Sequence, residues 1–199
     1  TLSRLLFLAL SVLLLHLPAF PAHLAAFGLI IFTIFIDAID GMIARRRGGA
    51  SALGAVLDIA IDRVVENVFW ITFVSLKLVP LWVALVVVTR GILTDAVRGF
   101  AMGQGMQPFE MMKTPWGRWL VSQRFMRGLY GFTKAVTFPA LALLHALLPE
   151  WAGTSMAPYL PILRLAVDVL VAITIAMNLL RGIPVLVESR RFFFAEQKT

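Results

Sequence analysis

The chain of 199 residues contains no cysteine. This absence excludes disulfide bonds, thiolate metal sites and a cysteine nucleophile, while the cellular compartment stays open. Charge is also scarce, since charged residues make up 15% of the chain and apolar residues 60%. A soluble domain has about 25% charged residues. The composition therefore predicts a protein whose main solvent is lipid rather than water.

Apolar runs fill most of the sequence, and several reach or approach the roughly 20 residues that a helix needs to cross a bilayer. Proline-rich connectors at residues 17–21 and 77–80 separate neighbouring runs, because proline resists helix interiors. We therefore predict an all-α integral membrane protein with six transmembrane helices in a single domain over residues 1–199. The expected spans are Leu5–Leu17, Ala22–Ala44, Leu53–Leu76, Leu81–Phe100, Phe132–Leu148 and Pro161–Val187.

The positive charges are distributed unevenly over these six spans. Of the 18 lysines and arginines, all except Lys77 and Arg164 fall on or near the side that holds the amino terminus. Cytoplasmic loops of membrane proteins carry an excess of such residues. This pattern indicates that both termini are cytoplasmic. It also explains the formal net charge of +7 without a nucleic-acid partner.

The stretch Gly99–Gly131 differs from the apolar runs, because glycines and prolines interrupt it and cations and aromatic residues are frequent in it. We expect an interfacial segment there, with a short amphipathic helix near Trp119–Tyr130 that lies against the headgroups of membrane lipids. A plain cytoplasmic loop is the alternative interpretation.

Acidic residues number only eleven, and four of them lie close together at the predicted cytoplasmic ends of two spans: Asp37, Asp40, Asp58 and Asp62. An ionised carboxylate at the apolar edge of a membrane is costly unless it is paired, hydrated or bound to a cation. Spacings of three and four residues place each pair on one helix face. The short link Gly41–Gly54 predicts a hairpin in which the two pairs could face one another.

Four converging carboxylates would repel one another without a counter-charge, whereas one or two divalent cations would hold them together. Carboxylate ligands without a nearby histidine or thiol indicate Mg²⁺ or Mn²⁺. Gly41, Ala44 and Gly54 leave room for a nucleotide near the backbone, and Arg45 could bind phosphate. A cytoplasmic anchor is the alternative interpretation of Arg45.

The string Asp37-Ala-Ile-Asp40-Gly41-Met-Ile-Ala44-Arg45 is followed after eight residues by Gly54, and then by Asp58 and Asp62 with three residues before each. This arrangement resembles the signature of the CDP-alcohol phosphotransferase (CDP-alcohol phosphatidyltransferase) family, with every fixed position filled. The resemblance implies a six-helix membrane enzyme of phospholipid biosynthesis with a cytoplasmic-side active-site cleft. An acceptor hydroxyl would attack the β-phosphorus of a CDP-linked alcohol and release CMP.

The same resemblance assigns roles to individual residues and implies a homodimer. It gives Asp37, Asp40, Asp58 and Asp62 to a two-metal centre of Mg²⁺ or Mn²⁺. It makes Asp62 the catalytic base that takes the proton of the acceptor hydroxyl. It places four residues around the CDP moiety of the donor: Gly41, Ala44, Arg45 and Gly54.

The sequence identifies the acceptor substrate less clearly than it identifies the donor. Five cations on the predicted cytoplasmic side could bind a phosphorylated acceptor, although topology alone could explain them: Arg90, Arg98, Lys113, Arg118 and Lys134. Four of these cations, Arg90, Arg98, Lys113 and Arg118, resemble the pattern of phosphatidylglycerophosphate synthases. That resemblance favours CDP-diacylglycerol as donor and glycerol 3-phosphate as acceptor. The pairs Asp58-Ile59 and Asp62-Arg63 depart from that subgroup, so inositol phosphate, inositol or an amino alcohol remains an alternative.

Two other classes of protein also deserve consideration. A cation transporter lined by the four aspartates would explain buried acids equally well, but an arginine beside a cation path would oppose transport. A catalytically silent scaffold would have no need of intact metal ligands.

The remaining polar residues are assigned less specific roles. Some have two possible interpretations, and for others we expect no catalytic function. Glu66, with Arg63 and Asn67, either extends the site or forms a buried network. Asp168 is expected to pair with Arg164. The three histidines appear in scattered positions without forming a ligand set, so we predict no functional role for His16, His23 and His145.

Overall fold

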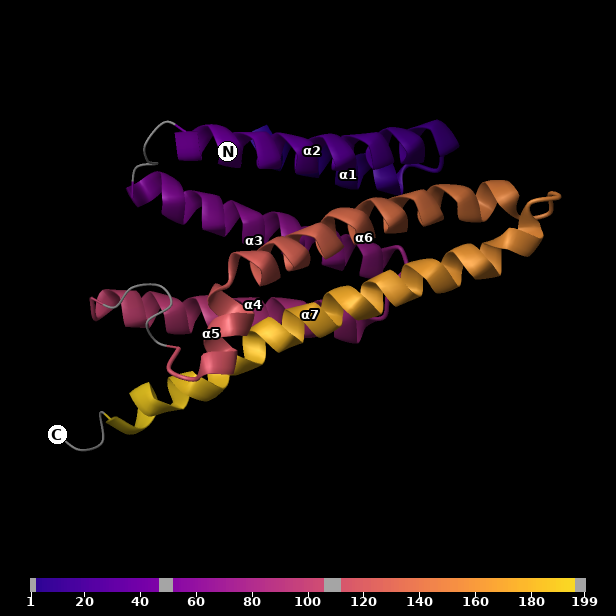
Figure 1. Cartoon of the computed structure of the whole chain (residues 1–199). Coiled ribbons are helices and arrows are strands. Elements are labelled where there is room, and N and C mark those ends of the chain that lie inside the picture. Colours follow the sequence, from indigo (N-terminus) through magenta and orange to yellow (C-terminus); the bar gives the residue numbers. More distant parts are fainter. Residues whose placement is uncertain (1–2, 47–51, 106–111, 196–199) are drawn as a thin grey trace. The chain divides into compact units, whose positions relative to one another are not determined.

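The structure is a computed structural model that describes residues 3–46, 52–105 and 112–195, excluding the side chains of residues 38, 40–46, 52–53, 55, 124 and 191–195. Within these ranges the chain is helical and contains no strand, as predicted. The helices, shown in Figure 1, are α1 (Ser3–His16), α2 (Phe20–Arg46), α3 (Ala52–Ser75), α4 (Leu81–Gly103), α5 (Pro115–Ser122), α6 (Arg124–Trp151), the short 3₁₀ helix η1 (Ala157–Tyr159) and α7 (Leu160–Ala195).

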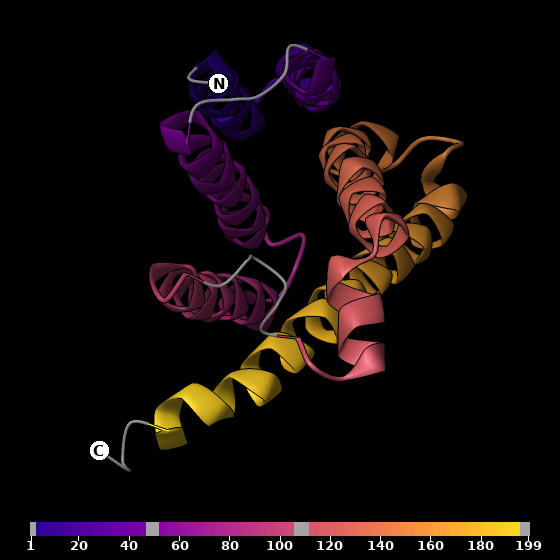
Figure 2. The same cartoon turned by 60° about the vertical axis from the view of Figure 1, so that its left-hand side comes forward.

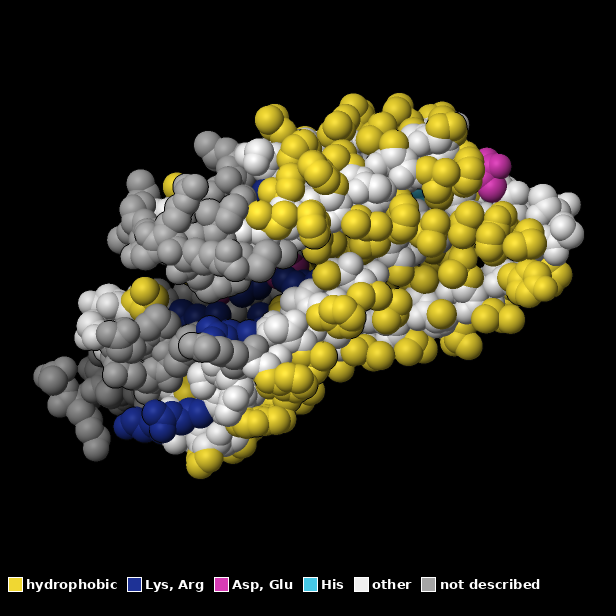
Figure 3. All heavy atoms as spheres, turned by 45° about the horizontal axis from the view of Figure 1, so that its top comes forward, with side chains coloured by type: hydrophobic (Ala, Val, Ile, Leu, Met, Phe, Trp, Pro, Cys, Tyr) yellow, Lys and Arg dark blue, Asp and Glu magenta, His cyan; other side chains and the backbone are white. Residues whose placement is uncertain are grey.

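Three of the described stretches are long and apolar enough to cross a membrane: Phe20–Asp37, Phe125–Trp151 and Ala157–Arg190. Helix α1 is apolar but only 14 residues long. Helices α3 and α4 have 24 and 23 residues but carry several charges along their length. Apolar side chains cover much of the face seen in Figure 3, as lipid contact requires. These features support an integral membrane protein, and six spans stay a prediction.

The described helices divide into two compact units, and the first comprises Thr1–Ala84 and Ala135–Leu170. In this unit α1 packs against α2 and α3, and the views in Figures 1 and 2 agree on this arrangement. An aromatic cluster joins α3 to α6, because the ring of Phe138 lies 5.3 Å from the rings of both Phe69 and Trp70. Trp70 and Phe73 are fully buried. This cluster fixes which face of α3 points inward.

The reversal after α3 depends on one residue in the left-handed region. Lys77 has φ of 57°, and the carbonyl of Phe73 accepts hydrogen bonds from the backbone N–H groups of Leu78 at 2.9 Å and Val79 at 3.4 Å. These bonds cap the helix end. Pro80 then precedes α4, so the predicted connector at residues 77–80 is confirmed as a turn.

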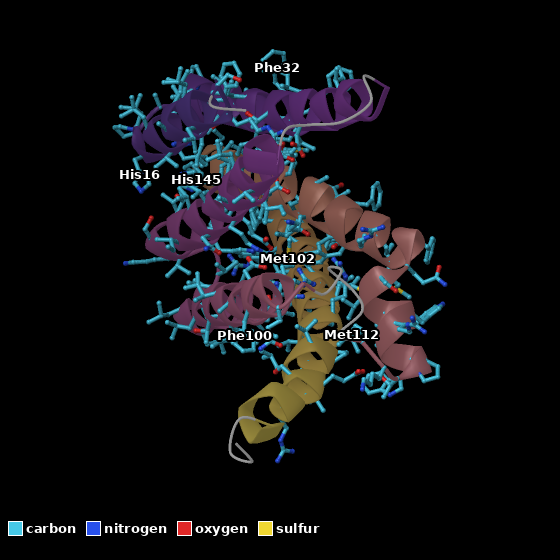
Figure 4. The ribbon with its side chains drawn as sticks, turned by 90° about the vertical axis from the view of Figure 1, so that its left-hand side faces the viewer. His16, Phe32, Phe100, Met102, Met112 and His145 are labelled. Carbon is cyan, nitrogen blue, oxygen red and sulfur yellow. The ribbon has the colours of Figure 1, made fainter. Side chains whose placement is uncertain are left out.

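The second unit comprises Leu85–Lys134 and Val171–Thr199. Its apolar core contains Ala101, Met112, Val121 and Val185, each 1% exposed or less. Figure 4 labels Met112, which lies just before α5. The core therefore joins the end of α4, the short helix α5 and the later part of α7.

The predicted amphipathic helix at Trp119–Tyr130 is wrong in its boundaries. Thr114 caps α5 and Pro115 occupies its first turn, so the helix begins four residues earlier, as such a cap favours. Gln123 has extended backbone with ψ of 133° and ends it. The following residues begin α6 instead.

Helix α5 is nevertheless amphipathic. Gly117 and Val121 are buried on one face, whereas Trp116 and Trp119 are about half exposed. Exposed tryptophans on a short amphipathic helix are typical of a membrane interface. The interfacial location therefore stays a prediction, now carried by a different helix.

A buried carboxylate fixes the start of α5 to α7. Glu188, on α7, accepts hydrogen bonds from the backbone N–H groups of Lys113 at 2.6 Å and Thr114 at 3.3 Å, and from the hydroxyl of Thr114. A Cβ atom at position 117 would collide with this carboxylate and with the Thr114 hydroxyl. Glycine at position 117 therefore leaves room for the Glu188 carboxylate and the Thr114 hydroxyl beside α5.

We predict that Glu188→Ala destabilises the chain by roughly 1–3 kcal/mol, because it leaves two partly buried N–H groups and a hydroxyl without their acceptor. Thermal unfolding in detergent should show a lower melting temperature than the wild-type chain. Glu150→Ala, which removes an exposed carboxylate from α6, is the matched control and should change little. Equal melting temperatures for the two variants would contradict this role of Glu188.

Candidate functional site

Three aspartates of the first unit converge on one guanidinium group. Arg4, in the first turn of α1, places Nη2 at 2.9 Å from Oδ1 of Asp58 and Nη1 at 3.3 Å from Oδ1 of Asp62. Nη1 also forms an ion pair with Oδ1 of Asp37. Asp37 comes from α2, and Asp58 and Asp62 lie one turn apart on α3. The structure therefore brings together three of the four aspartates that the sequence singles out.

The charges at this site differ strongly in exposure. The Arg4 side chain is 4% exposed, whereas those of Asp37, Asp58 and Asp62 are 44%, 54% and 59% exposed. A buried guanidinium is costly unless it is paired, and three carboxylates provide that pairing. In return, the guanidinium reduces the repulsion among the carboxylates. The site is thus a buried cation beneath carboxylates that solvent and solutes can reach.

The helical repeat of α3 explains why its acids lie at this position. Asp62 precedes the buried Phe69 by seven residues, and Glu66 precedes the buried Phe73 by the same interval. Residues seven apart lie on nearly the same face of a helix. The face that packs on the aromatic cluster therefore continues toward the start of α3 as a row of carboxylates.

The remaining predicted site residues are only partly described. Asp40, Gly41, Ala44 and Arg45 belong to the last turns of α2, but their side chains lie outside the described residues. Gly54 lies in the first turn of α3 and is half-buried. Gly54, Asp58 and Asp62 therefore all lie in the first half of α3.

The donor atoms at this site suit a hard divalent cation. They are carboxylate oxygens, which Mg²⁺ and Mn²⁺ prefer, and they already surround a positive charge. Among the described side chains, no three acidic or histidine groups share a point where one ion could bind, and the Arg4 guanidinium lies between the aspartates. The chemistry of the residues therefore fits a metal, and their present counter-ion is Arg4.

Sequence reasoning missed Arg4 as a site residue. A cation at the start of an apolar run has the ordinary explanation of a cytoplasmic anchor. One signal was available: Arg4 lies within the first turn of a helix whose other buried residues are Leu8, Ser11 and Leu15. The spacing of four puts Arg4 on the buried face.

Among the described side chains of the first unit, Arg63 and Arg164 also form ion pairs. Arg63 donates to Glu66 across 3.0 Å, and Glu66 is 2% exposed. This pair is compatible with both the site extension and the buried network considered above. Asp168 pairs with Arg164 across 3.1 Å, as predicted, and Arg164 also donates to the carbonyl of Leu78 at 2.7 Å.

The histidines are less scattered than the sequence indicates. The rings of His23 and His145 are in contact, with centroids 4.4 Å apart, so the expectation of separate positions is wrong for this pair. His145 contacts the carbonyl of Leu15 at 3.0 Å, and His16 contacts the hydroxyl of Ser75 at 3.1 Å. Figure 4 labels His16 and His145. The described histidines and acids form no three-ligand set, and a functional role stays unassigned.

The second unit contains a group of cations around Tyr130. The ring of Tyr130 lies 4.8 Å from Nζ of Lys134 and 5.3 Å from Cζ of Arg181. Its hydroxyl accepts a hydrogen bond of 2.6 Å from Nδ2 of the buried Asn178. These contacts place a lysine and an arginine on one aromatic ring, an arrangement that stabilises both cations.

Arg181 also lies within electrostatic range of Arg90, Arg98 and Arg127. Arg90 is 6% exposed, and its side chain fills the space that a Cβ at position 182 would need. Arg98 pairs with Asp95 at 3.8 Å. Such a concentration of like charge is costly, and anionic groups nearby lower that cost.

The structure therefore places Arg181, Tyr130 and Asn178 beside Lys134, one of the five cations predicted from the sequence. Sequence reasoning considered only Asp168 and Arg164 among the polar residues of 161–187 and gave Asn178 and Arg181 no role in a site. The interval of three between Asn178 and Arg181 was the available signal, since it puts both on one face of a helix. Of the five predicted cations, Lys113 and Arg118 have exposed side chains.

Comparison with known proteins gives a family match over most of the chain. The family model described as CDP-alcohol phosphatidyltransferase matches residues 1–180, which include Arg4 and the three aspartates that it pairs with, and the group around Tyr130 except Arg181. No curated protein and no solved structure matches the chain. Enzymes of this family transfer a phosphatidyl group from a CDP-alcohol and generally depend on a divalent metal. The chain belongs to the CDP-alcohol phosphatidyltransferase family.

Proposed function

We propose that this chain transfers the phosphatidyl group of CDP-diacylglycerol to the hydroxyl group of glycerol 3-phosphate and releases CMP. The convergence of Asp37, Asp58 and Asp62 on one buried cation carries the proposal. Two helices of the signature supply these carboxylates to a position that is open to solutes. Transfer between phosphate-bearing substrates requires a centre of this kind, because charge must be balanced at the reacting phosphorus.

On the donor side, Asp37, Asp40, Asp58 and Asp62 would hold two Mg²⁺ or Mn²⁺ ions. The metal would supply neutralisation of the charge on the diphosphate and on the leaving CMP. Gly41, Ala44 and Gly54 would leave the backbone accessible to the nucleotide, and Arg45 would donate hydrogen bonds to phosphate.

The reaction itself requires a base. Asp62 would accept the proton of the acceptor hydroxyl, whose oxygen then forms a bond with the β-phosphorus of the donor. The bond between that phosphorus and the CMP oxygen breaks, and CMP leaves with the bonding electron pair. Asp62 suits this role because its carboxylate is 59% exposed, so an acceptor hydroxyl can reach it.

On the acceptor side, the cations of the second unit would bind the phosphate of glycerol 3-phosphate. Arg90, Arg98, Arg181 and Lys134 provide several donors, and guanidinium groups bind phosphate through two parallel hydrogen bonds. Lys113 and Arg118 would add exposed positive charge near α5. Inositol phosphate carries the same group and is the nearest rival. Inositol and amino alcohols lack a phosphate and would leave these cations unused.

We also propose the arrangement in the membrane. A single domain over residues 1–199 would cross the bilayer six times, with both termini and the active-site cleft on the cytoplasmic side and α5 at the lipid headgroups. The chain would act as a homodimer. The charge asymmetry of the predicted loops supports the orientation, and the exposed tryptophans of α5 support its interfacial place.

Asp62→Asn should lower the rate of CMP release from CDP-diacylglycerol by at least roughly a hundredfold, because the variant cannot accept the acceptor proton. The assay uses purified protein, Mg²⁺ or Mn²⁺ and glycerol 3-phosphate. Asp168→Asn is the control, because Asp168 also pairs with an arginine in the first unit. Normal turnover by a folded Asp62→Asn variant would refute the assignment of the base.

Arg181→Gln should raise the KM for glycerol 3-phosphate by roughly 10- to 100-fold, because a charge-assisted contact to phosphate is lost, while the KM for the donor changes little. Arg164→Gln, on the same helix, is the control. A screen with inositol phosphate, inositol and serine identifies the acceptor class. Turnover with serine alone would exclude a phosphorylated acceptor, and metal flux in liposomes without CMP release would favour a transporter.

A further inference from the structure

We propose that Arg4 is an internal counter-ion that competes with the divalent metal for the aspartates of the site. In this account Arg4 holds the metal-free site together and gives up its carboxylates when metal binds. The inference rests on the metal centre proposed above and adds a residue that neither the signature nor the sequence reasoning assigns to it.

The first argument is that the same oxygen atoms are involved. Arg4 contacts Oδ1 of each of the three aspartates through its two terminal nitrogens. A metal held by Asp37, Asp58 and Asp62 needs carboxylate oxygens from the same cluster. A guanidinium and a dication within a few ångströms of one another would also repel strongly at a partly buried site. The two cations therefore cannot both occupy the cluster without cost.

The second argument concerns what else holds the guanidinium. Its Nε atom is buried and has no hydrogen-bond partner in the described part of the chain. Arg4 thus depends on the aspartates for its pairing, and a buried charge that loses its partners is unfavourable. A metal that neutralises those aspartates removes the ion pairs that stabilise the buried position of Arg4.

The third argument is that Arg4 can move without loss of the helix that carries it. It lies in the first turn of α1, and helix ends open at the lowest free energy. Leu8 and Leu15 are 4% and 1% exposed, so their packing keeps α1 in place. Displacement would therefore be limited to the first turn.

A purely structural clamp makes the opposite prediction. If Arg4 only organised the three carboxylates, its removal would scatter them and weaken metal binding. If Arg4 competes, its removal strengthens metal binding, because two cations that need the same carboxylates weaken each other's binding reciprocally. The sign of the change separates the two roles.

The test measures Mn²⁺ affinity by electron paramagnetic resonance for the full chain in detergent, without nucleotide or acceptor. Arg4→Gln should bind Mn²⁺ roughly tenfold more tightly than the wild-type chain, which is within the usual range of coupling between sites. Arg164→Gln, which also removes an arginine paired with an aspartate, should leave the affinity unchanged. Unchanged or weaker binding by Arg4→Gln would overturn the inference.

Hydrogen exchange on the wild-type chain provides a second readout that does not depend on whether the variant folds. Added Mg²⁺ should speed amide exchange at Phe7 and Leu8, whose N–H groups bond to carbonyls of the first turn of α1, since Arg4 is released, and slow it around Asp58 and Asp62. Slower exchange at Phe7 and Leu8 as well would contradict competition. Absence of Mn²⁺ binding by the wild-type chain would instead overturn the metal centre itself, and Asp58→Asn should reproduce that loss.

Discussion

The pairing of one buried guanidinium with three aspartates is the constraint on which the first unit depends. Arg4 is nearly inaccessible, yet Asp37, Asp58 and Asp62 are about half exposed. Each partner would be unfavourable alone: a cation among apolar helices, and carboxylates close enough to repel one another. Together they join α1 to both helices of the signature. The same electrostatics that stabilise this junction leave a negatively charged surface where a metal and a nucleotide diphosphate would meet.

Arginine has opposite electrostatic surroundings in the two compact units. In the first unit an arginine is outnumbered by carboxylates, so the local charge attracts cations. In the second unit, Arg181 has other arginines within range and rests on the ring of Tyr130, an arrangement that suits an anion. The transfer proposed above would use both kinds of site.

The sequence predicts the helical membrane class and the proximity of the aspartates, because composition and a rigidly spaced motif are local properties. It also predicts the pairing of Asp168 with Arg164, which lies within one turn of a helix. It misses Arg4, because a cation at the start of a span already has a topological explanation. The contact of His23 with His145 and the group around Tyr130 join distant segments and leave no local signal. The boundary of α5 was missed because the Thr114-Pro115 cap was not weighed.

Pulsed electron paramagnetic resonance of Mn²⁺ bound to the chain with CDP-diacylglycerol tests the central claim most directly. Our account predicts a ³¹P hyperfine coupling from the donor diphosphate, because the aspartates of α2 and α3 would hold the metal that the phosphates contact. The coupling should disappear in Asp58→Asn. Steady CMP release by a Mn²⁺-loaded chain that shows no ³¹P coupling, or a coupling that persists in Asp58→Asn, would contradict the account.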